Sequence, residues 1–374
     1  MSSKPEVGVG IVGYGLMGRA HAHGYTVAPH VRDLPCLPRL RVISGRNSEA
    51  VARAAARYGV EEWTADWREV VTRPDVQIVD VCTPPGTHAE IVEAAAAEGK
   101  AVLCEKPLAA EYAAAATAAR VVADAGVPNA IGFNYRRLPA LALMKRLIDE
   151  GHVGDILLWR SVWLSDEFLD PDIPFDWRFE RAMGASTIAD LGAHLIDLAL
   201  WMVGEIVDVA AQSETFTPER SGRSVDVDEA SSVLVRFADG ARGTFEMART
   251  CARRPCDFFV EVNGTGGTLR FDYPRLNELW YGDARDDDVF YGLRRIRAES
   301  PRHPYARDWW PIGQGLGYGV TFVNQAADHL ERWPDGPWDP DLAQGARVQS
   351  ICEAMERAAA EARWVGVREI DYAR

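Results

Sequence analysis

Three ionisable side chains, Lys106, Asp190 and His194, have the types and settings that proton transfer requires. Lys106 follows an apolar run at 101–104 and precedes Pro107, which places it at the end of a predicted buried strand. Desolvation lowers the pKa of a lysine toward the range in which it exchanges a proton. The alternative for an isolated lysine is a surface salt bridge.

Asp190 and His194 are four residues apart in a predicted helix at 189–203, so they share one helical face. Histidine accepts protons near neutral pH, and a carboxylate one turn earlier can orient the ring or bind a substrate hydroxyl. In isolation, such a pair is more often a helix-surface contact. Asp197, three residues later, is either a supporting partner or a structural residue.

A glycine-rich turn precedes these residues in the chain. Gly13, Tyr14, Gly15, Leu16, Met17 and Gly18 match G-x-G-x-x-G, after a predicted strand at 7–12 and at the start of a predicted helix. In that context the glycines permit a tight turn, close approach of a pyrophosphate and close helix packing. The pattern predicts a dinucleotide site at a helix N-terminus; the alternative is a glycine turn without a ligand.

The residue that normally binds the cofactor ribose is absent. An acid is expected about 20 residues after the glycines, at the end of the second strand. Counting alone nominates Asp33, but it lies in a segment with three prolines before the predicted strand at 40–44. That strand ends at Gly45, Arg46 and Asn47. Arg46 suits the 2′-phosphate of NADP or stacks on adenine with NAD bound, and Asn47 suits a ribose hydroxyl, so both cofactors remain open.

The predicted elements place these motifs in an α/β fold with two domains. Short apolar runs alternate with helices over residues 1–133, which predicts a Rossmann domain with a doubly wound parallel sheet. Helix 48–58 is expected to be capped by Ser48. Residues 134–374 predict an α+β substrate-binding and oligomerisation domain with a large, mostly antiparallel sheet. Its strands include 156–164, 207–213, 230–237, 243–249 and 258–262, and residues 280–318 read as an irregular surface segment or lid.

The composition excludes several classes of protein. Lys and Arg number 41 against 55 acids, a net charge of −14, which disfavours nucleic acid and anionic membranes as partners. No apolar run is long enough to span a membrane, and no signal core begins the chain. The six cysteines form no C-x-x-C pair, which indicates reduced thiols in a cytoplasmic protein, and no spacing predicts a metal.

Several motifs together resemble the glucose–fructose oxidoreductase, inositol dehydrogenase and MocA (Gfo/Idh/MocA) family. They are the T-P-x-x-x-H loop from Thr83 to His88, the E-K-P motif at 105–107, the stretch 132–137, the D-x-G-x-H-x-x-D stretch at 190–197 and the glycine turn at 264–267. The resemblance spans both predicted domains and is strongest to the levoglucosan dehydrogenase-like group.

The resemblance implies hydride transfer between nicotinamide C4 and a carbinol carbon of a sugar, anhydrosugar, glycoside or cyclitol. His194 would act as general base, Lys106 would polarise the oxygen or relay its proton, and Asp190 would orient His194 or the substrate. Glu105 would line the nicotinamide side or brace Lys106, which is itself an expected cofactor contact. Thr83, Pro84 and His88 would shape the loop over the cofactor ribose, although His88 equally suits a helix cap.

Aromatic and basic residues suit a carbohydrate ligand. Tyr135, Arg136, Trp177 and Arg178 are candidates for substrate binding, with core packing as the alternative. Trp309, Trp310 and Tyr318 would close the same pocket or form a subunit interface, whereas His21 and His23 read as packing residues. A homo-oligomer, dimer or tetramer, through the outer face of the broad sheet is expected. The alternative functions are reduction of another carbonyl or imine, and a dinucleotide-binding sensor without chemistry.

Overall fold

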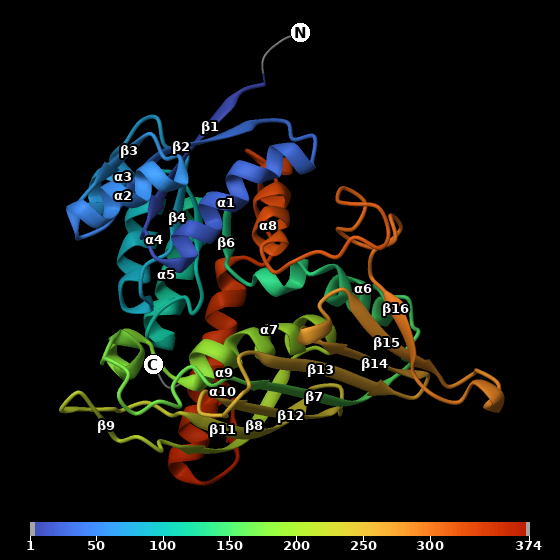
Figure 1. The fold of residues 1–374 in the computed structure, drawn as a ribbon. Coiled ribbons are helices and arrows are strands. Elements are labelled where there is room, and N and C mark those ends of the chain that lie inside the picture. The colour runs from blue at the N-terminus through green and yellow to red at the C-terminus, as the bar shows by residue number, and fades with distance from the viewer. Residues whose placement is uncertain (1–3, 372–374) are drawn as a thin grey trace. The chain divides into compact units, whose positions relative to one another are not determined.

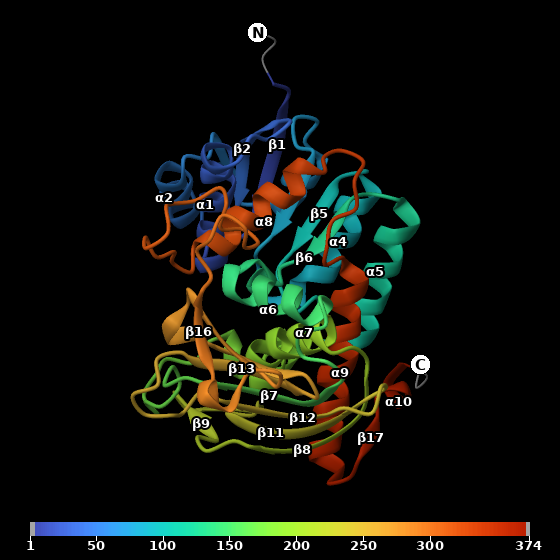
Figure 2. The same cartoon turned by 90° about the vertical axis from the view of Figure 1, so that its right-hand side faces the viewer.

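The computed structural model describes residues 4–371 of the chain. It divides into two compact units, residues 1–137 with 318–347 and residues 138–317 with 348–374. Each unit contains one large sheet, as Figures 1 and 2 show.

The first unit is a parallel six-stranded sheet in the order β3-β2-β1-β4-β5-β6, the strand order of a Rossmann fold. Its strands are β1 (Glu6–Val12), β2 (Leu37–Ser44), β3 (Glu62–Thr64), β4 (Ile78–Val81), β5 (Ala101–Cys104) and β6 (Asn129–Ile131). Its helices are α1 (Leu16–Val31), α2 (Ser48–Tyr58), α3 (Trp67–Thr72), α4 (His88–Ala97), α5 (Tyr112–Ala125) and α8 (Val320–Glu331).

Helix α8 returns from the distant C-terminal part of the sequence to pack along α1, and both ribbon views show the two side by side. Gly24 permits this close approach, because a Cβ there would lie 2.6 Å from the carbonyl oxygen of Phe322. The Rossmann unit is therefore completed by a segment far from it in sequence.

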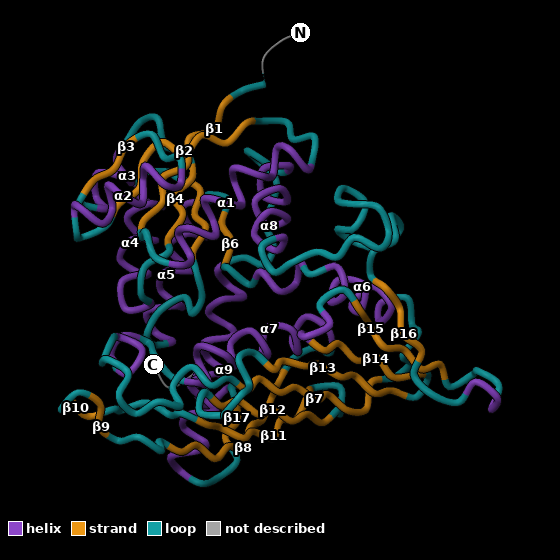
Figure 3. Tube along the Cα trace, in the orientation of Figure 1, coloured by secondary structure: helices purple, strands orange, loops and turns teal. Residues whose placement is uncertain are grey.

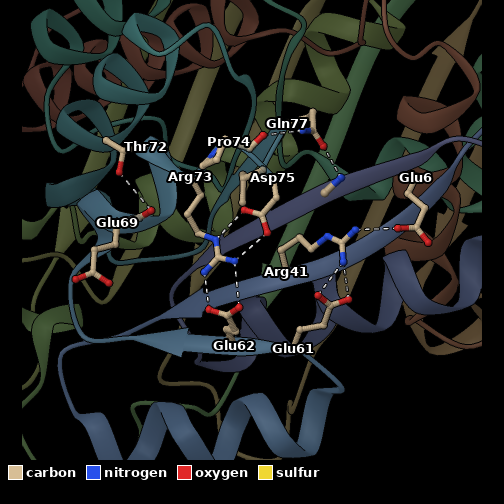
Figure 4. A network of polar contacts seen from close by, with 12 residues as sticks. Glu6, Arg41, Glu61, Glu62, Glu69, Thr72, Arg73, Pro74, Asp75 and Gln77 are labelled. Atoms are coloured by element: carbon tan, nitrogen blue, oxygen red, sulfur yellow. Dashed lines mark hydrogen bonds and ion pairs between the residues drawn. The ribbon is translucent and has the colours of Figure 1, made fainter.

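Ion pairs join the outer ends of neighbouring elements in this sheet (Figure 4). The Arg41 guanidinium lies 2.8 Å from carboxylate oxygens of both Glu6 and Glu61, and Arg73 bridges Glu62 and Asp75 at 2.7 and 2.8 Å. The network lowers the pKa of Glu6 through the hydrogen bond from Arg39 foremost. These carboxylates are well exposed, so the pairs stabilise the fold only modestly.

The second unit is built on a nine-stranded sheet in the order β16-β15-β14-β13-β7-β12-β11-β8-β17. All neighbours are antiparallel except β12 and β7. Its strands are β7 (Ile156–Leu164), β8 (Ile206–Glu214), β11 (Ala230–Phe237), β12 (Arg242–Ala248), β13 (Asp257–Gly264), β14 (Gly267–Asp272), β15 (Glu278–Asp283), β16 (Arg294–Arg297) and β17 (Val365–Gly366). A small separate hairpin consists of β9 (Glu219–Arg220) and β10 (Arg223–Ser224).

Helices cover one face of this sheet. They are α6 (Pro139–Asp149), α7 (Ala193–Met202), α9 (Leu342–Glu361), whose first residues belong to the other unit, and the short α10 (Arg368–Asp371). The inward residues of the strands are large and apolar, including Trp159, Phe245, Phe258 and Phe271, all at most 1% exposed. Strand alternation places the other half of the side chains on the outer face.

The predicted fold class is confirmed, and several bounds differ. Strands 101–104, 156–164 and 230–237 were predicted as observed. The predicted proline-rich insert before the second strand is wrong. Pro29 lies in the last turn of α1, and Pro38 lies at the beginning of β2, ahead of the residues of β2 that pair with β3. Strand β3, helix α3 and strands β14 and β17 were missed.

The irregular segment predicted at 280–318 is partly wrong. Its first part completes β15 and forms β16, which pair with each other at the sheet edge. The loop between them, with a short 3₁₀ turn at Asp288–Phe290, projects from that edge in Figure 3. The strands were hidden because glycine, charged and aromatic residues interrupt the apolar alternation.

Candidate active site

The glycine turn after β1 has the geometry that dinucleotide binding requires. Gly13 has φ +111°, and a Cβ there would lie 2.6 Å from the carbonyl oxygen of Cys82. A Cβ on Gly18 would lie 2.1 Å from the carbonyl oxygen of Gly13, so the turn and α1 need both glycines. Gly15 faces open space, and no side chain caps α1. The free N–H groups at this N-terminus suit a pyrophosphate.

Gly45 is constrained by the same turn. A Cβ at Gly45 would fall 2.1 Å from the ring of Tyr14, so no acid fits at the end of β2 while Tyr14 keeps this position. Arg46 and Asn47 are exposed. The Asn47 side chain accepts the Ala50 N–H at 3.0 Å and caps α2, so the expected cap at Ser48 is wrong by one residue.

His88 connects the loop after β4 to the E-K-P motif. Its Nε2 lies 2.6 Å from the Thr83 carbonyl oxygen, and its Nδ1 lies 2.9 Å from the Pro107 carbonyl oxygen. Burial lowers the pKa of His88 despite these hydrogen bonds. Thr83 and Thr87 hydroxyls are also 2.8 Å apart, and Pro84 precedes the 3₁₀ turn Pro85–Thr87. A buried His88 therefore holds the two loops together.

Lys106 follows β5 directly and is half-buried. Its backbone N–H donates to Oε2 of Glu105 at 3.2 Å, and Glu105 is 4% exposed. Oε1 of Glu105 lies 3.0 Å from Nε2 of His21, which also contacts Asp80. Sequence reasoning missed this contact; an aspartate inside the apolar run 76–82 was the available signal.

Tyr135 and Arg136 lie in a 3₁₀ segment after β6. Tyr135 is 5% exposed and packs against the ring of Tyr318, with centroids 5.7 Å apart. Arg136 is 8% exposed, and its guanidinium lies 3.6 Å from the Asp339 carboxylate. These contacts fix the positions of both side chains.

Asp190 and His194 lie in the second unit, around a change of helix type. Residues Ile188–Gly192 form a π-helical turn, and α7 begins at Ala193, so the helix expected at 189–203 is irregular at its start. Single π-turns within helices are frequent at functional sites. His194 is 7% exposed and stacks on Trp163, with ring centroids 5.7 Å apart. Asp197 is buried.

The orientation of Asp190 depends on a residue that the sequence did not reveal. Nη2 of Arg249 lies 2.8 Å from its carboxylate and 2.9 Å from the Ser186 carbonyl oxygen. The Arg249 side chain is 1% exposed, whereas that of Asp190 is 32% exposed. Arg249 therefore anchors a partly accessible carboxylate. The available signal was an arginine on the buried side of the alternating strand 243–249.

Trp177 and Arg178 form a local turn with Asp176. Asp176 accepts the Arg178 N–H at 2.8 Å, and the Arg178 guanidinium lies 4.6 Å from the centre of the Trp177 ring. Trp177 packs on a small apolar cluster around Phe168 and Phe179. Trp309 and Trp310 contact each other, and Trp310 is 62% exposed.

One group of described residues brings possible metal ligands together: atoms of His21, Asp80 and Cys82 lie within 4.8 Å of one another. Hydrogen bonds among them account for this spacing, since His21 lies 2.9 Å and the Cys82 thiol 3.3 Å from the same Asp80 oxygen.

Among residues 4–371, no helix is long and apolar enough to cross a membrane.

Comparison with known proteins decides the family. A model described as an oxidoreductase family with an NAD-binding Rossmann fold matches residues 7–133, and one for the GFO/IDH/MocA C-terminal domain matches residues 141–270. The chain belongs to the Gfo/Idh/MocA oxidoreductase family. Levoglucosan dehydrogenase of Pseudarthrobacter phenanthrenivorans is 37% identical over 98% of this chain and 99% of its own length.

Solved structures agree with this membership. An oxidoreductase domain protein from Kribbella flavida matches with a TM-score of 0.95 and 40% identity, over 97% of this chain and 99% of its own. Levoglucosan dehydrogenase in complex with NADH and levoglucosan matches with a TM-score of 0.94 and 38% identity over the same shares. The family resemblance and the oxidoreductase class predicted from the motifs are confirmed, with sugar, cyclitol and anhydrosugar dehydrogenases among the relatives.

Proposed function

We propose that this Gfo/Idh/MocA protein is an NAD(H)-dependent dehydrogenase of a sugar or anhydrosugar hydroxyl, with levoglucosan as the first substrate to test. The observation that carries the proposal is the full-length similarity to levoglucosan dehydrogenase, over 98% of this chain. The uncapped α1 N-terminus and the open space at Gly15 fit the pyrophosphate of a nicotinamide dinucleotide. When bound, that cofactor supplies the hydride acceptor.

Three side chains are proposed to handle the alcohol proton and oxygen. His194 takes the alcohol proton as general base, and Lys106 polarises the same oxygen or relays its proton. Asp190, anchored by Arg249, orients His194 or a substrate hydroxyl. The other proposed cofactor contacts are residues 13–18, Gly45 to Asn47, Thr83, Pro84, His88 and Glu105, and the proposed substrate contacts include Tyr135, Arg136, Trp177 and Arg178.

A substrate panel tests the function directly. Levoglucosan, hexoses, inositols and glycosides are each mixed with NAD or NADP, and reduced cofactor is followed by absorbance. We expect turnover with at least one anhydrosugar or sugar. Cofactor binding without turnover of any polyol contradicts the proposal and favours the sensor or imine-reductase alternative.

Arg46 is expected to govern any use of NADP. A charge-assisted hydrogen bond to a 2′-phosphate contributes about 1.5–3 kcal/mol, so Arg46→Ala should lower kcat/KM for NADP by about ten- to a hundredfold. The value for NAD should change less than about threefold. Steady-state kinetics with each cofactor measures both. Arg53→Ala, on the exposed side of α2, is the matched control. Equal losses with both cofactors would instead indicate stacking on adenine.

We propose that the outer face of the nine-stranded sheet forms a homo-oligomer interface. A hollow on this face is lined by Arg160, Leu234 and Phe259 among others. Leu234 is 53% exposed, and the guanidinium groups of Arg160 and Arg270 lie over the Phe259 ring. An apolar surface ringed by charge suits a second copy of the chain.

Leu234→Glu should therefore weaken the oligomer, because it puts a carboxylate into that apolar surface. Sedimentation velocity should show a shift toward the 41.3 kDa monomer at micromolar concentration. Leu169→Glu, at a loop leucine that is 45% exposed, is the control and should leave the mass unchanged. An unchanged mass for Leu234→Glu contradicts this interface.

A cytoplasmic location and a domain boundary after residue 133 complete the proposal. The six cysteines are all free thiols, which supports the location. The Rossmann family model ends at residue 133, which supports the boundary.

A further inference from the structure

His21 on α1 lies between two buried carboxylates. Its Nδ1 is 2.9 Å from both carboxylate oxygens of Asp80, and its Nε2 is 3.0 Å from Oε1 of Glu105. The three residues are 2%, 0% and 4% exposed. Each ring nitrogen therefore faces a carboxylate, in an interior where water cannot mediate the contact.

These contacts determine the charge of the ring. A neutral imidazole has one N–H donor and one acceptor nitrogen, and an acceptor nitrogen facing a carboxylate oxygen is repelled. Both nitrogens donate only in the imidazolium form. Burial lowers the pKa of His21, but the charges and hydrogen bonds of Asp80 and Cys82 more than offset it, so the pKa lies well above its usual value. The titratable groups around the ring are Asp80, Cys82, Glu105, Tyr25 and His329.

The second oxygen of Glu105 connects this charge to the E-K-P motif. Oε2 accepts the backbone N–H of Lys106 at 3.2 Å while Oε1 contacts His21. Gly132 leaves room for this carboxylate, because a Cβ there would lie 2.5 Å from Oε1. The Glu105 carboxylate is thus held by a hydrogen bond at each oxygen, immediately before Lys106.

We propose that His21 is a positioning residue for hydride transfer, a permanent buried imidazolium that holds Glu105 and thereby the backbone of Lys106. The positioning claim rests on the proposed function, which gives Lys106 its role in catalysis. The claim that His21 is charged rests only on its contacts with Asp80 and Glu105. Loss of the imidazolium leaves two buried carboxylates without their cationic partner, which favours uptake of a proton by one of them.

The charge state is tested first, without any substrate. Wild-type protein with nitrogen-15-labelled histidine carries eight labelled rings. We expect one ring to remain doubly protonated at about pH 9, where an ordinary histidine is neutral. That signal should be missing in His21→Gln. Burial lowers the pKa of His88 and of His329, so these rings are expected to lose their second proton at a lower pH than His21.

The positioning role is tested by kinetics of His21→Gln against His23→Gln, an exposed histidine on the same helix. We expect kcat to fall at least about tenfold in His21→Gln, with the NADH dissociation constant within about threefold of wild type. We also expect a new ionisation in the pH–rate profile, from a buried carboxylate that has lost its cationic partner. A purely structural defect would lower activity without adding that ionisation.

Three results overturn the inference: a neutral His21 ring at neutral pH, a wild-type pH profile and kcat in His21→Gln, or a stoichiometric metal that this substitution removes. If His21→Gln does not fold, Glu105→Gln replaces it, and the proposal requires the titration midpoint of the His21 ring to fall in that variant. If Lys106→Met keeps its activity while the ring is doubly protonated, the proposed role of Lys106 fails and the charge assignment survives.

Discussion

Lys106→Met is expected to lower kcat by about a thousandfold or more, equivalent to about 4 kcal/mol of transition-state stabilisation. Methionine keeps the length and apolar stem of the side chain but removes the ammonium group that polarises the substrate oxygen. The Lys106 backbone N–H still donates to Glu105, so the loop should keep its conformation. Single-turnover and steady-state rates with the substrate found in the panel measure the loss.

The controls separate chemistry from folding and from cofactor binding. Fluorescence titration should give an NADH dissociation constant within about threefold of wild type. Lys145→Met is the matched control, because Lys145 pairs with Asp149 on α6 and takes no part in the proposed chemistry. Full activity of Lys106→Met would remove lysine from the mechanism.

His194→Asn is expected to lower kcat by about a hundred- to ten-thousandfold, the range for loss of a general acid–base group. Asparagine fills part of the space against Trp163 and retains hydrogen bonding, but it does not exchange a proton near neutral pH. The variant should also lose the ionisation of the base from its pH–rate profile. Alcohol oxidation should regain rate at high pH, where hydroxide replaces the base.

His152→Asn provides the comparison for this prediction, since His152 lies at the surface of the same unit and contacts Tyr281. Its kcat and pH profile should match those of wild type. A His194→Asn enzyme that keeps the wild-type pH profile would show that another group accepts the proton, and Asp190 would then be the next candidate. Circular dichroism of each variant checks that the fold persists.

The local features of this protein were predictable from the sequence because each depends on a few neighbouring residues. Gly13 adopts a φ of +111°, and a Cβ on Gly18 would clash with the Gly13 carbonyl oxygen, so the glycine pattern specifies that turn by itself. Strands at 101–104 and 156–164 were predicted with their observed bounds, since buried strands have apolar or alternating patterns. The family motifs also predicted the oxidoreductase class, which the comparisons confirm.

Edge strands were harder to predict. Strand β16 gains its order from pairing with β15, which in turn pairs with β14, and its own residues Arg294 to Arg297 are mostly charged. Such a segment has little apolar pattern of its own. Its structure is decided by the hydrogen bonds of a neighbouring strand rather than by its composition.

The sequence alone determined that a dinucleotide turn, an E-K-P lysine and an Asp–His pair are present. Only the tertiary structure decided which groups hold them. Asp80 and Glu105 are 59 and 84 positions from His21, and Arg249 is 59 positions from Asp190. Parallel strands and packed helices bring these charges together in a dry interior, where an unpaired charge is costly and each one needs a partner. Pairing across such separations leaves no periodic signal in the chain.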